Sequence, residues 1–275
     1  MSQENGSTGT QPNDPAPPPA NAAPPGPPPS IPAERVYALG HNQRPDPRWF
    51  LGVDFGQRHD HSAICVLDLV WIPRGRCPVT FGSLFLPQLT IRHLDRKPLL
   101  TSYEEIHEDL VSYLDQLQHR FAINGFRADP MTEIILDAGG PGPPMIDRIR
   151  RAIPGGVRIS PVLITGGKGE TTLVDGYTGV PRRSLITRFI QMVNVRHLTL
   201  PPALDFWEEL KAELLDLKGD TMQPASSDGH DDLVMATSLA VWAACRSVPE
   251  LVPGAIRRDN PGPPYQIGHC PFPLF

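Results

Sequence analysis

The chain has 275 residues, 40% of them hydrophobic, which is enough for one substantial domain with tails. Its formal net charge of −5 argues against a protein whose whole surface binds nucleic acid, so any such contact must be local. Its four cysteines form no C-x-x-C pair, and no apolar run approaches the ~20 residues of a membrane span, so we expect a cytoplasmic protein that neither enters nor crosses a membrane.

Both ends of the chain are rich in proline. The 34 prolines gather mainly in residues 1–34 and 247–275, where few large apolar residues occur. Such segments bury too little surface to offset the entropy of ordering them. The sequence therefore predicts a disordered proline-rich tail at 1–34, one folded domain at 35–246 and a proline-rich C-terminal tail at 247–275.

The first half of the domain reads as strands. Residues 49–56 and 62–72 are apolar and rich in β-branched and aromatic side chains, with a short turn between them. Residues 79–94 predict a third strand with a bend at Pro87. Three consecutive strands joined by short connections indicate an antiparallel sheet.

Helices and further strands follow. Residues 101–122 place apolar side chains at helical spacing behind a Thr101 or Ser102 cap. A βαβ unit is predicted from strand 132–138, helix 142–153 and strand 157–165, which adds parallel strands to the sheet. Three more helices are predicted at 184–195, 204–217 and 231–245, the last nearly all apolar and hence buried. The fold class is α/β, a mixed sheet flanked by helices.

Two aspartates stand at the ends of predicted strands. Asp54 closes the apolar run 51–53 just before Gly56, and Asp137 closes the run 134–136 just before a glycine-rich turn. Each could simply support its turn, which strand-ending aspartates often do. Their shared placement also lets them converge, because ligands in α/β sheets collect at strand ends.

A third group of acids precedes the last helix. Asp228, His230, Asp231 and Asp232 lie within five residues. Helix capping explains one or two acids there, at about 0.3 to 1 kcal/mol each, but not the whole group. Converging carboxylates repel one another unless cations bind them, and oxygen ligands without cysteine favour Mg²⁺ or Mn²⁺.

In this order, the motifs resemble the C-terminal nuclease domain of phage terminase large subunits. The matching segments are residues 52–56 with Asp60 and Ser62, then 136–142, 164–167, 180–182, and 230–234 with Ala236. The resemblance covers nearly all of the predicted domain. It implies a ribonuclease H-like fold, related to Holliday-junction resolvases, and a two-metal endonuclease that hydrolyses DNA.

The resemblance also implies roles for single residues. Asp54 would bridge two Mg²⁺ or Mn²⁺ ions, Asp137 would hold one of them, and the pair Asp231 and Asp232 would complete the site. Which of these two is the ligand stays open. Asp60 would be a further direct or indirect ligand, and His230 could orient water or a carboxylate.

Two features depart from the family. No G-x-x-x-x-G-K-[ST] motif occurs, so a packaging-type ATPase is expected to be a separate partner. Arg182 follows Pro181 where relatives often have lysine. Two sets of arginines could grip the phosphates of DNA or could equally be solvated helix faces. They are Arg182, Arg183 and Arg188, and Arg148, Arg150 and Arg151.

Other interpretations remain. The domain could be a catalytically silent, ribonuclease H-like module that binds DNA or scaffolds partners through its proline-rich tails. A nucleotide site at residues 137–142 is disfavoured, because the turn does not fit G-x-G-x-x-G and its prolines lack amide donors. A zinc site at His59, Asp60 and His61 is disfavoured too, since adjacent residues in an extended turn point apart.

Overall fold

The computed structural model describes the folded part of the chain in segments. They are residues 37–39, 48–56, 60–76, 83–123, 132–140, 142–153, 157–201, 203–219, 222–224 and 230–248. The predicted N-terminal tail therefore lies wholly outside the described residues, only Ser247 and Val248 of the predicted C-terminal tail are described, and the tail boundaries stay a prediction. Helix α5 (Asp232–Ser247) runs on to Ser247, and Val248 is buried against the core.

Within these residues a nine-stranded sheet forms the centre of the fold, with the order β1-β4-β3-β2-β5-β6-β8-β7 and with β9 beside β4. A separate pair, β10 and β11, forms a small second sheet. The strands are β1 Tyr37–Leu39, β2 Arg48–Asp54, β3 Ala63–Arg76, β4 Ser83–Arg96, β5 Thr132–Asp137, β6 Arg158–Thr165, β7 Thr171–Thr172, β8 Thr178–Pro181, β9 Leu198–Thr199, β10 Leu217–Lys218 and β11 Gln223–Pro224.

Strand directions confirm the predicted mixed sheet. Strands β2, β3 and β4 are antiparallel neighbours, and β5 and β6 continue the sheet in parallel from β2. The fold is the α/β, ribonuclease H-like arrangement expected from the sequence. Sequence reasoning missed β8, which extends the parallel part beside β6. Pairing between β3 and β4 runs through Pro87 without a shift, and the register shifts instead at Arg92 of β4 and at Arg74 of β3.

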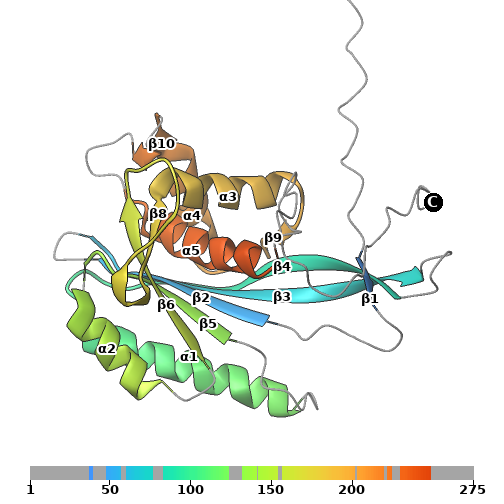
Figure 1. Cartoon of the computed structure of the whole chain (residues 1–275), viewed down its shortest axis with the longest axis horizontal. Helices are drawn as coiled ribbons and strands as arrows, with labels where there is room; N and C mark the ends of the chain where they lie inside the picture. The colour runs from blue at the N-terminus through green and yellow to red at the C-terminus, as the bar shows by residue number, and fades with distance from the viewer. Residues whose placement is uncertain are drawn as a thin grey trace, which may run out of the picture. The chain divides into compact units, whose positions relative to one another are not determined.

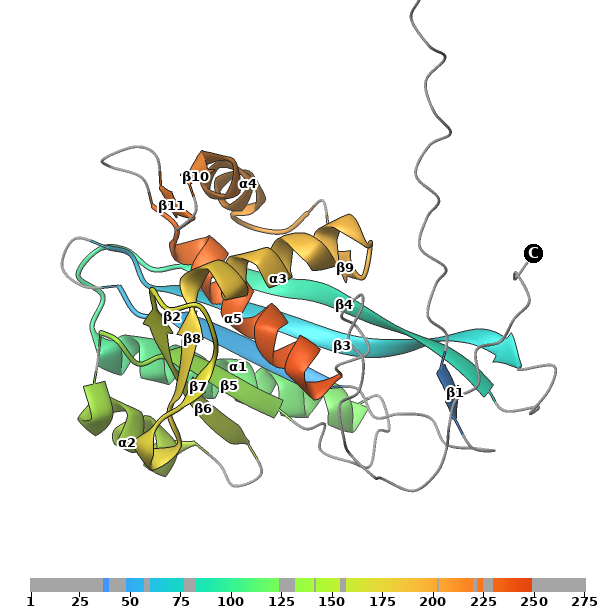
Figure 2. The same ribbon diagram turned by 45° about the horizontal axis from the view of Figure 1, so that its top comes forward.

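Helices cover both faces of the sheet. Figure 1 shows α1 and α2 on one face and α3, α4 and α5 on the other, and Figure 2 shows α3 and α5 lying across the strands. No described helix is both long and apolar enough to span a membrane. The helices are α1 Tyr103–Ile123, α2 Gly142–Ala152, α3 Arg182–Asn194, α4 Trp207–Asp216 and α5 Asp232–Ser247, with a 3₁₀ turn η1 at Val174–Gly176.

Each face has its own hydrophobic core, because the central strands are buried on both sides. Alternate residues of β2 serve the two cores: Phe50 packs on the α5 side, and Leu51 and Val53 pack on the α1 side. Gly52 lets α5 lie directly on β2, since a Cβ there would come within 2.0 Å of the Ala236 carbonyl oxygen. The backbone contact fixes where α5 begins relative to the strand ends.

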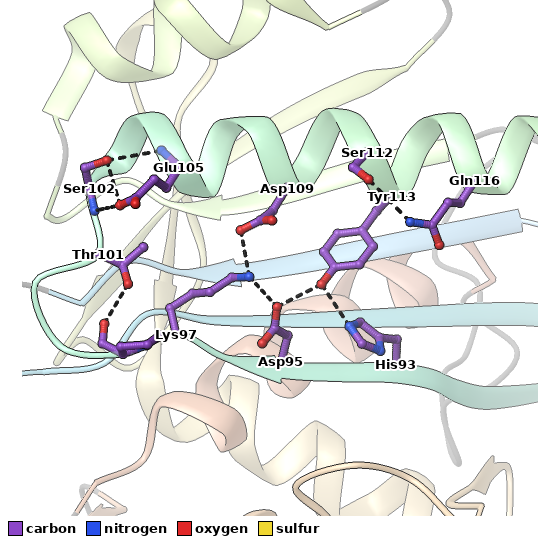
Figure 3. Close-up of polar contacts among 11 residues, drawn as sticks. His93, Asp95, Lys97, Thr101, Ser102, Glu105, Asp109, Ser112, Tyr113 and Gln116 are labelled. Atoms are coloured by element: carbon purple, nitrogen blue, oxygen red, sulfur yellow. Dashed lines mark hydrogen bonds and ion pairs between the residues drawn. The ribbon is translucent and has the colours of Figure 1, made fainter.

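A polar network ties α1 to β4. Lys97 lies between Asp95 and Asp109, at 2.5 and 2.6 Å from their carboxylates, and the Tyr113 hydroxyl donates to Asp95 Oδ2 at 2.8 Å (Figure 3). His93 Nε2 meets the same hydroxyl at 2.9 Å. Burial raises the pKa of Asp95, but hydrogen bonds from Lys97 and Tyr113 outweigh it and hold that pKa below its ordinary value.

The predicted cap of α1 is also present. The backbone N–H of Glu105 donates to Ser102 Oγ at 3.2 Å, and Glu105 Oε2 accepts from the Ser102 backbone N–H at 2.7 Å (Figure 3). This is a reciprocal capping box, which satisfies two N–H groups that the helix leaves open. Of the two predicted candidates, Ser102 is therefore the cap.

Removing the Tyr113 hydroxyl should weaken the fold without touching the strand ends. We expect Tyr113→Phe to lower the free energy of unfolding by about 1 to 2 kcal/mol, because a charged acceptor loses a hydrogen bond. Urea unfolding at 25 °C measures it. Ser112→Ala is the matched control on the same helix, since Ser112 only accepts an exposed bond from Gln116, and should stay within about 0.5 kcal/mol. Equal effects of the two changes would contradict the network's role.

Candidate functional site

Asp54 and Asp137 end two neighbouring parallel strands at the same level of the sheet. The last paired residues of β2 and β5 are Val53 and Leu136, and the two aspartates follow directly. Their side chains lie on the α5 face, because Val53 and Leu136 before them point to the α1 face. The two carboxyl groups lie close enough for each to act on the pKa of the other. The convergence expected from the sequence is therefore present.

The acid pair is electrostatically costly. Burial raises the pKa of Asp54 well above its usual value, the charges of Asp137 and Asp232 raise it further, and Arg182 opposes them. Burial also raises the pKa of Asp137, although hydrogen bonds from the Gly139 backbone and from Asp54 lower it in part. The charged forms of both carboxyls are therefore disfavoured where water does not fully solvate them.

A hydrogen bond within the following turn explains part of the placement of the Asp137 carboxylate. It does not explain the placement of the Asp54 carboxylate. Asp137 Oδ1 accepts the Gly139 N–H at 2.9 Å, which is the alternative expected for an aspartate before a glycine turn. After Asp54, the turn is closed by Ser62 instead, whose hydroxyl accepts the Gly56 N–H at 3.0 Å. A Cβ on Gly56 would lie 2.2 Å from the Asp60 carbonyl oxygen, so only glycine fits this turn.

The N-terminus of α5 brings a third carboxylate to the pair. Asp231 is the N-cap residue but makes no side-chain capping bond, so capping does not explain the acids. Its carboxylate pairs with Arg182. Asp232 is buried and acts on Asp54 through its charge. The structure thus separates the two neighbours: the charge of Asp232 acts on Asp54, and Asp231 is held by an arginine.

Arg182 lies among the acids rather than on an outer helix face. It opens α3, its Nε donates to the Met222 carbonyl at 3.0 Å, and its guanidinium pairs with Asp231. Burial lowers its pKa, and the charges of Asp54 and Asp137 raise it in part. Its positive charge partly neutralises the cluster.

Asp232 has neighbours on both sides. Its Oδ2 lies 3.6 Å from Arg96 Nη2 and 3.8 Å from His230 Nδ1. Burial raises the pKa of Asp232, Arg96, His230 and His61 lower it, and the exposed Asp60 raises it. The rings of His61 and His230 stack edge to face with centroids 5.1 Å apart. Asp60 and His230 therefore lie at the candidate site, as the sequence suggested.

The remaining predicted residues lie elsewhere or are not described. Arg183 is exposed on α3, and Arg188 contacts Gln191 of the same helix at 3.5 Å. The second arginine set is tied to carboxylates and backbone of α1 and α2: Arg148 to Glu104, Arg150 to Asp147 and Arg151 to the Asp147 carbonyl. Asp228 and His59 lie outside the described residues.

Sequence reasoning missed two charged residues at the site, Arg96 and Glu213. Arg96 contacts Asp232 and pairs with Glu213, whose side chain is only 6% exposed. Glu213 carried a usable signal, because it follows Leu210 by three residues and so falls on the apolar stripe of α4. A charge on that stripe must be buried with a partner.

The donor set suits a hard divalent cation. Burial and neighbouring charge raise the pKa of Asp54, burial raises that of Asp137, and Asp232 Oδ2 is buried without a hydrogen bond from the described residues, so a cation would compensate these oxygens. In the described part of the chain, no three side chains of the ligand types already stand in metal-binding geometry. The fit therefore rests on chemistry and placement of the oxygens.

Comparison with known proteins finds no match in sequence and distant likenesses in structure. No protein-family model and no curated protein matches the sequence. Two solved structures of the human cytomegalovirus terminase nuclease domain are similar. One, Mn-soaked and inhibitor-bound, is 11% identical with a TM-score of 0.41, covering 72% of this chain and 82% of that one. The other, Mn-soaked, is 13% identical with a TM-score of 0.39, covering 70% and 82%. Identities this low assign no activity to the chain.

Proposed function

We propose that this chain is a metal-dependent endonuclease that hydrolyses DNA phosphodiesters with two Mg²⁺ or Mn²⁺ ions. One observation carries the proposal: Asp54 and Asp137 meet at the ends of neighbouring parallel strands, under the buried Asp232 at the start of α5. Clustered, partly desolvated carboxylates cost free energy unless cations bind them. Groups whose pKa values are perturbed by burial and by neighbouring charges are commonly found at functional sites.

Each acid has a proposed role. The charges of Asp137 and Asp232 both act on Asp54, so Asp54 would contact both ions. Asp137 and Asp232 would hold one ion each. Asp60 would contribute from the β2–β3 turn, and Asp231 would stay bound to Arg182. Paired divalent ions would polarise the phosphodiester, activate the attacking water and stabilise the leaving oxygen.

The arginines of α3 support DNA as the proposed substrate. Arg182 holds its charge beside the acids, and Arg183 and Arg188 extend the positive charge along the same helix. Phosphate contacts of this kind position a duplex without reading its sequence. A separate ATPase or other packaging-type protein would deliver the DNA.

The two acids that begin α5 should differ in a cleavage assay. Purified protein with supercoiled plasmid and Mn²⁺ is expected to give nicked and linear DNA, and EDTA should stop the reaction. Asp232→Asn should slow cleavage at least about 10²-fold, because a lost ligand weakens charge stabilisation by several kcal/mol. Asp231→Asn should slow it less than about tenfold. Equal loss in both variants would contradict the assignment of Asp232.

A catalytically silent DNA-binding module is the second candidate. Its support is that arginines already neutralise part of the cluster: Arg182 pairs with Asp231, and Arg96 lies 3.6 Å from Asp232. This candidate predicts that calorimetric titration with Mn²⁺ gives no heat of binding, while DNA still binds. The nuclease proposal predicts saturable Mn²⁺ binding that Asp137→Asn weakens.

A further inference from the structure

Two buried carboxylates and one largely buried arginine, from three distant segments, meet at the start of α5. Arg96 ends β4, Glu213 lies on α4 and Asp232 is the first residue of α5. Their side chains are 15%, 6% and 6% exposed. Burying three charges requires mutual compensation, so their arrangement is held tightly by its own electrostatics.

The sheet register explains why Arg96 reaches this place. Ala63 of β3 pairs with Asp54 on one side and with Arg96 on the other. Directly paired residues point to the same face, and Ala63 belongs to the core beneath α5. Arg96 and Asp54 therefore project toward α5 from one row across the sheet, two strands apart.

Glu213 holds both the helix and the arginine. Its Oε2 accepts the Val234 backbone N–H at 3.0 Å, which satisfies a donor that the first turn of α5 leaves open. Its Oε1 pairs with Arg96. One carboxylate from α4 thus does the capping that Asp231 and Asp232 do not, and leaves their oxygens for other partners.

Arg96 lies close to Glu213 and farther from Asp232. Its Nη2 contacts Glu213 Oε1 directly but stays 3.6 Å from Asp232 Oδ2. That Oδ2 is buried and accepts no hydrogen bond from the described residues. The arginine therefore attracts the Asp232 carboxylate without occupying the oxygen.

From this geometry we infer that Arg96 and Glu213 are a positioning pair, which aims the Asp232 carboxylate at the Asp54–Asp137 pair and keeps its free oxygen available to a divalent cation. The inference rests on the proposed function. Without Glu213, Arg96 is free to close on Asp232 and cover that oxygen. Without Arg96, two buried carboxylates face each other and Asp232 turns away.

The test is Mn²⁺ affinity in the absence of DNA. Glu213→Gln keeps an oxygen for the Val234 N–H but loses the charge that holds Arg96, and Arg96→Gln removes the guanidinium. We expect each to raise the Mn²⁺ dissociation constant about 10- to 100-fold, as changes to groups that orient metal ligands commonly do. Calorimetric titration of the full chain, well below each variant's melting temperature, measures it.

A matched control separates positioning from stability. Arg92 and Asp68 form an arginine–aspartate pair between the same two strands, at 2.6 Å, on the opposite face of the sheet. Arg92→Gln should lower the melting temperature and leave the Mn²⁺ dissociation constant within twofold. Arg96→Lys keeps the charge and should retain more affinity than Arg96→Gln, and it also serves as the test if the neutral variants fail to fold.

Different failures have different meanings. If Glu213→Gln and Arg96→Gln melt at lower temperature but bind Mn²⁺ within twofold of the unaltered protein, the pair is merely structural and the inference is overturned. If the unaltered protein binds no Mn²⁺, the proposed function itself fails and the positioning role fails with it. Weakened binding in these variants, with binding preserved in Arg92→Gln, supports both.

Discussion

Asp54→Asn is expected to abolish Mn²⁺-dependent DNA cleavage and, at the same time, to stabilise the metal-free protein. Cleavage should fall at least about 10³-fold, because a central ligand supplies several kcal/mol of charge stabilisation and each 1.36 kcal/mol is about tenfold in rate. The stabilisation follows from the raised pKa of Asp54, which burial and the charges of Asp137 and Asp232 cause.

The stability difference between Asp54→Asn and the unaltered protein should depend on pH in one direction. A carboxyl whose pKa is higher in the folded than in the unfolded state favours folding below its unfolded pKa of about 3.9 and loses that contribution as pH rises through the folded pKa. In EDTA, the melting temperature of Asp54→Asn minus that of the unaltered protein should therefore be near zero at about pH 4, grow with pH and then level off. Thermal melts from pH 4 to 8 measure this difference.

Two comparisons sharpen this prediction. Asp147→Asn alters an exposed acid on α2 and should change neither cleavage nor the pH profile. Adding Mn²⁺ should raise the melting temperature of the unaltered protein much more than that of Asp54→Asn, because a ligand that binds the folded state stabilises it. A variant that is less stable at every pH, by the same amount, would show that Asp54 is a structural residue.

Gly52→Ala should have the largest effect on the fold. The added Cβ would lie 2.0 Å from the Ala236 carbonyl oxygen and 2.8 Å from the Ala240 nitrogen. Both atoms belong to the backbone of α5, so no side chain can move aside, and the helix itself must shift. We expect a loss of about 3 kcal/mol or more in the free energy of unfolding.

Urea unfolding followed by circular dichroism measures this loss. Gly166→Ala is the matched control, because a Cβ there meets nothing within 4 Å and the change should stay within about 0.5 kcal/mol. Because α5 begins at Asp232, a shifted helix also displaces that carboxylate. DNA cleavage by the Gly52→Ala variant should thus fall even under conditions in which the variant remains folded. Full cleavage activity together with an unchanged free energy of unfolding would contradict the close packing of α5 on β2.

What the sequence determined by itself is the set of long elements and the placement of two acids at strand ends. The apolar runs of β2 to β6 and the helical spacing of α1 and α5 are local patterns, and they predicted these elements correctly. The strand-end positions of Asp54 and Asp137 were predicted because each closes an apolar run before a glycine turn, and parallel strands bring such ends together. The short strands, β8 among them, have too few residues for any periodicity to reveal.

Only the tertiary structure distinguishes Asp231 from Asp232. Asp231 and Asp232 are equivalent in sequence, but successive residues entering a helix point in different directions, so one meets Arg182 and the other lies beside Arg96 under Glu213. Those partners come from β4, α3 and α4, and no local pattern links them to α5. They meet because the sheet register and the close contact at Gly52 set where α5 begins.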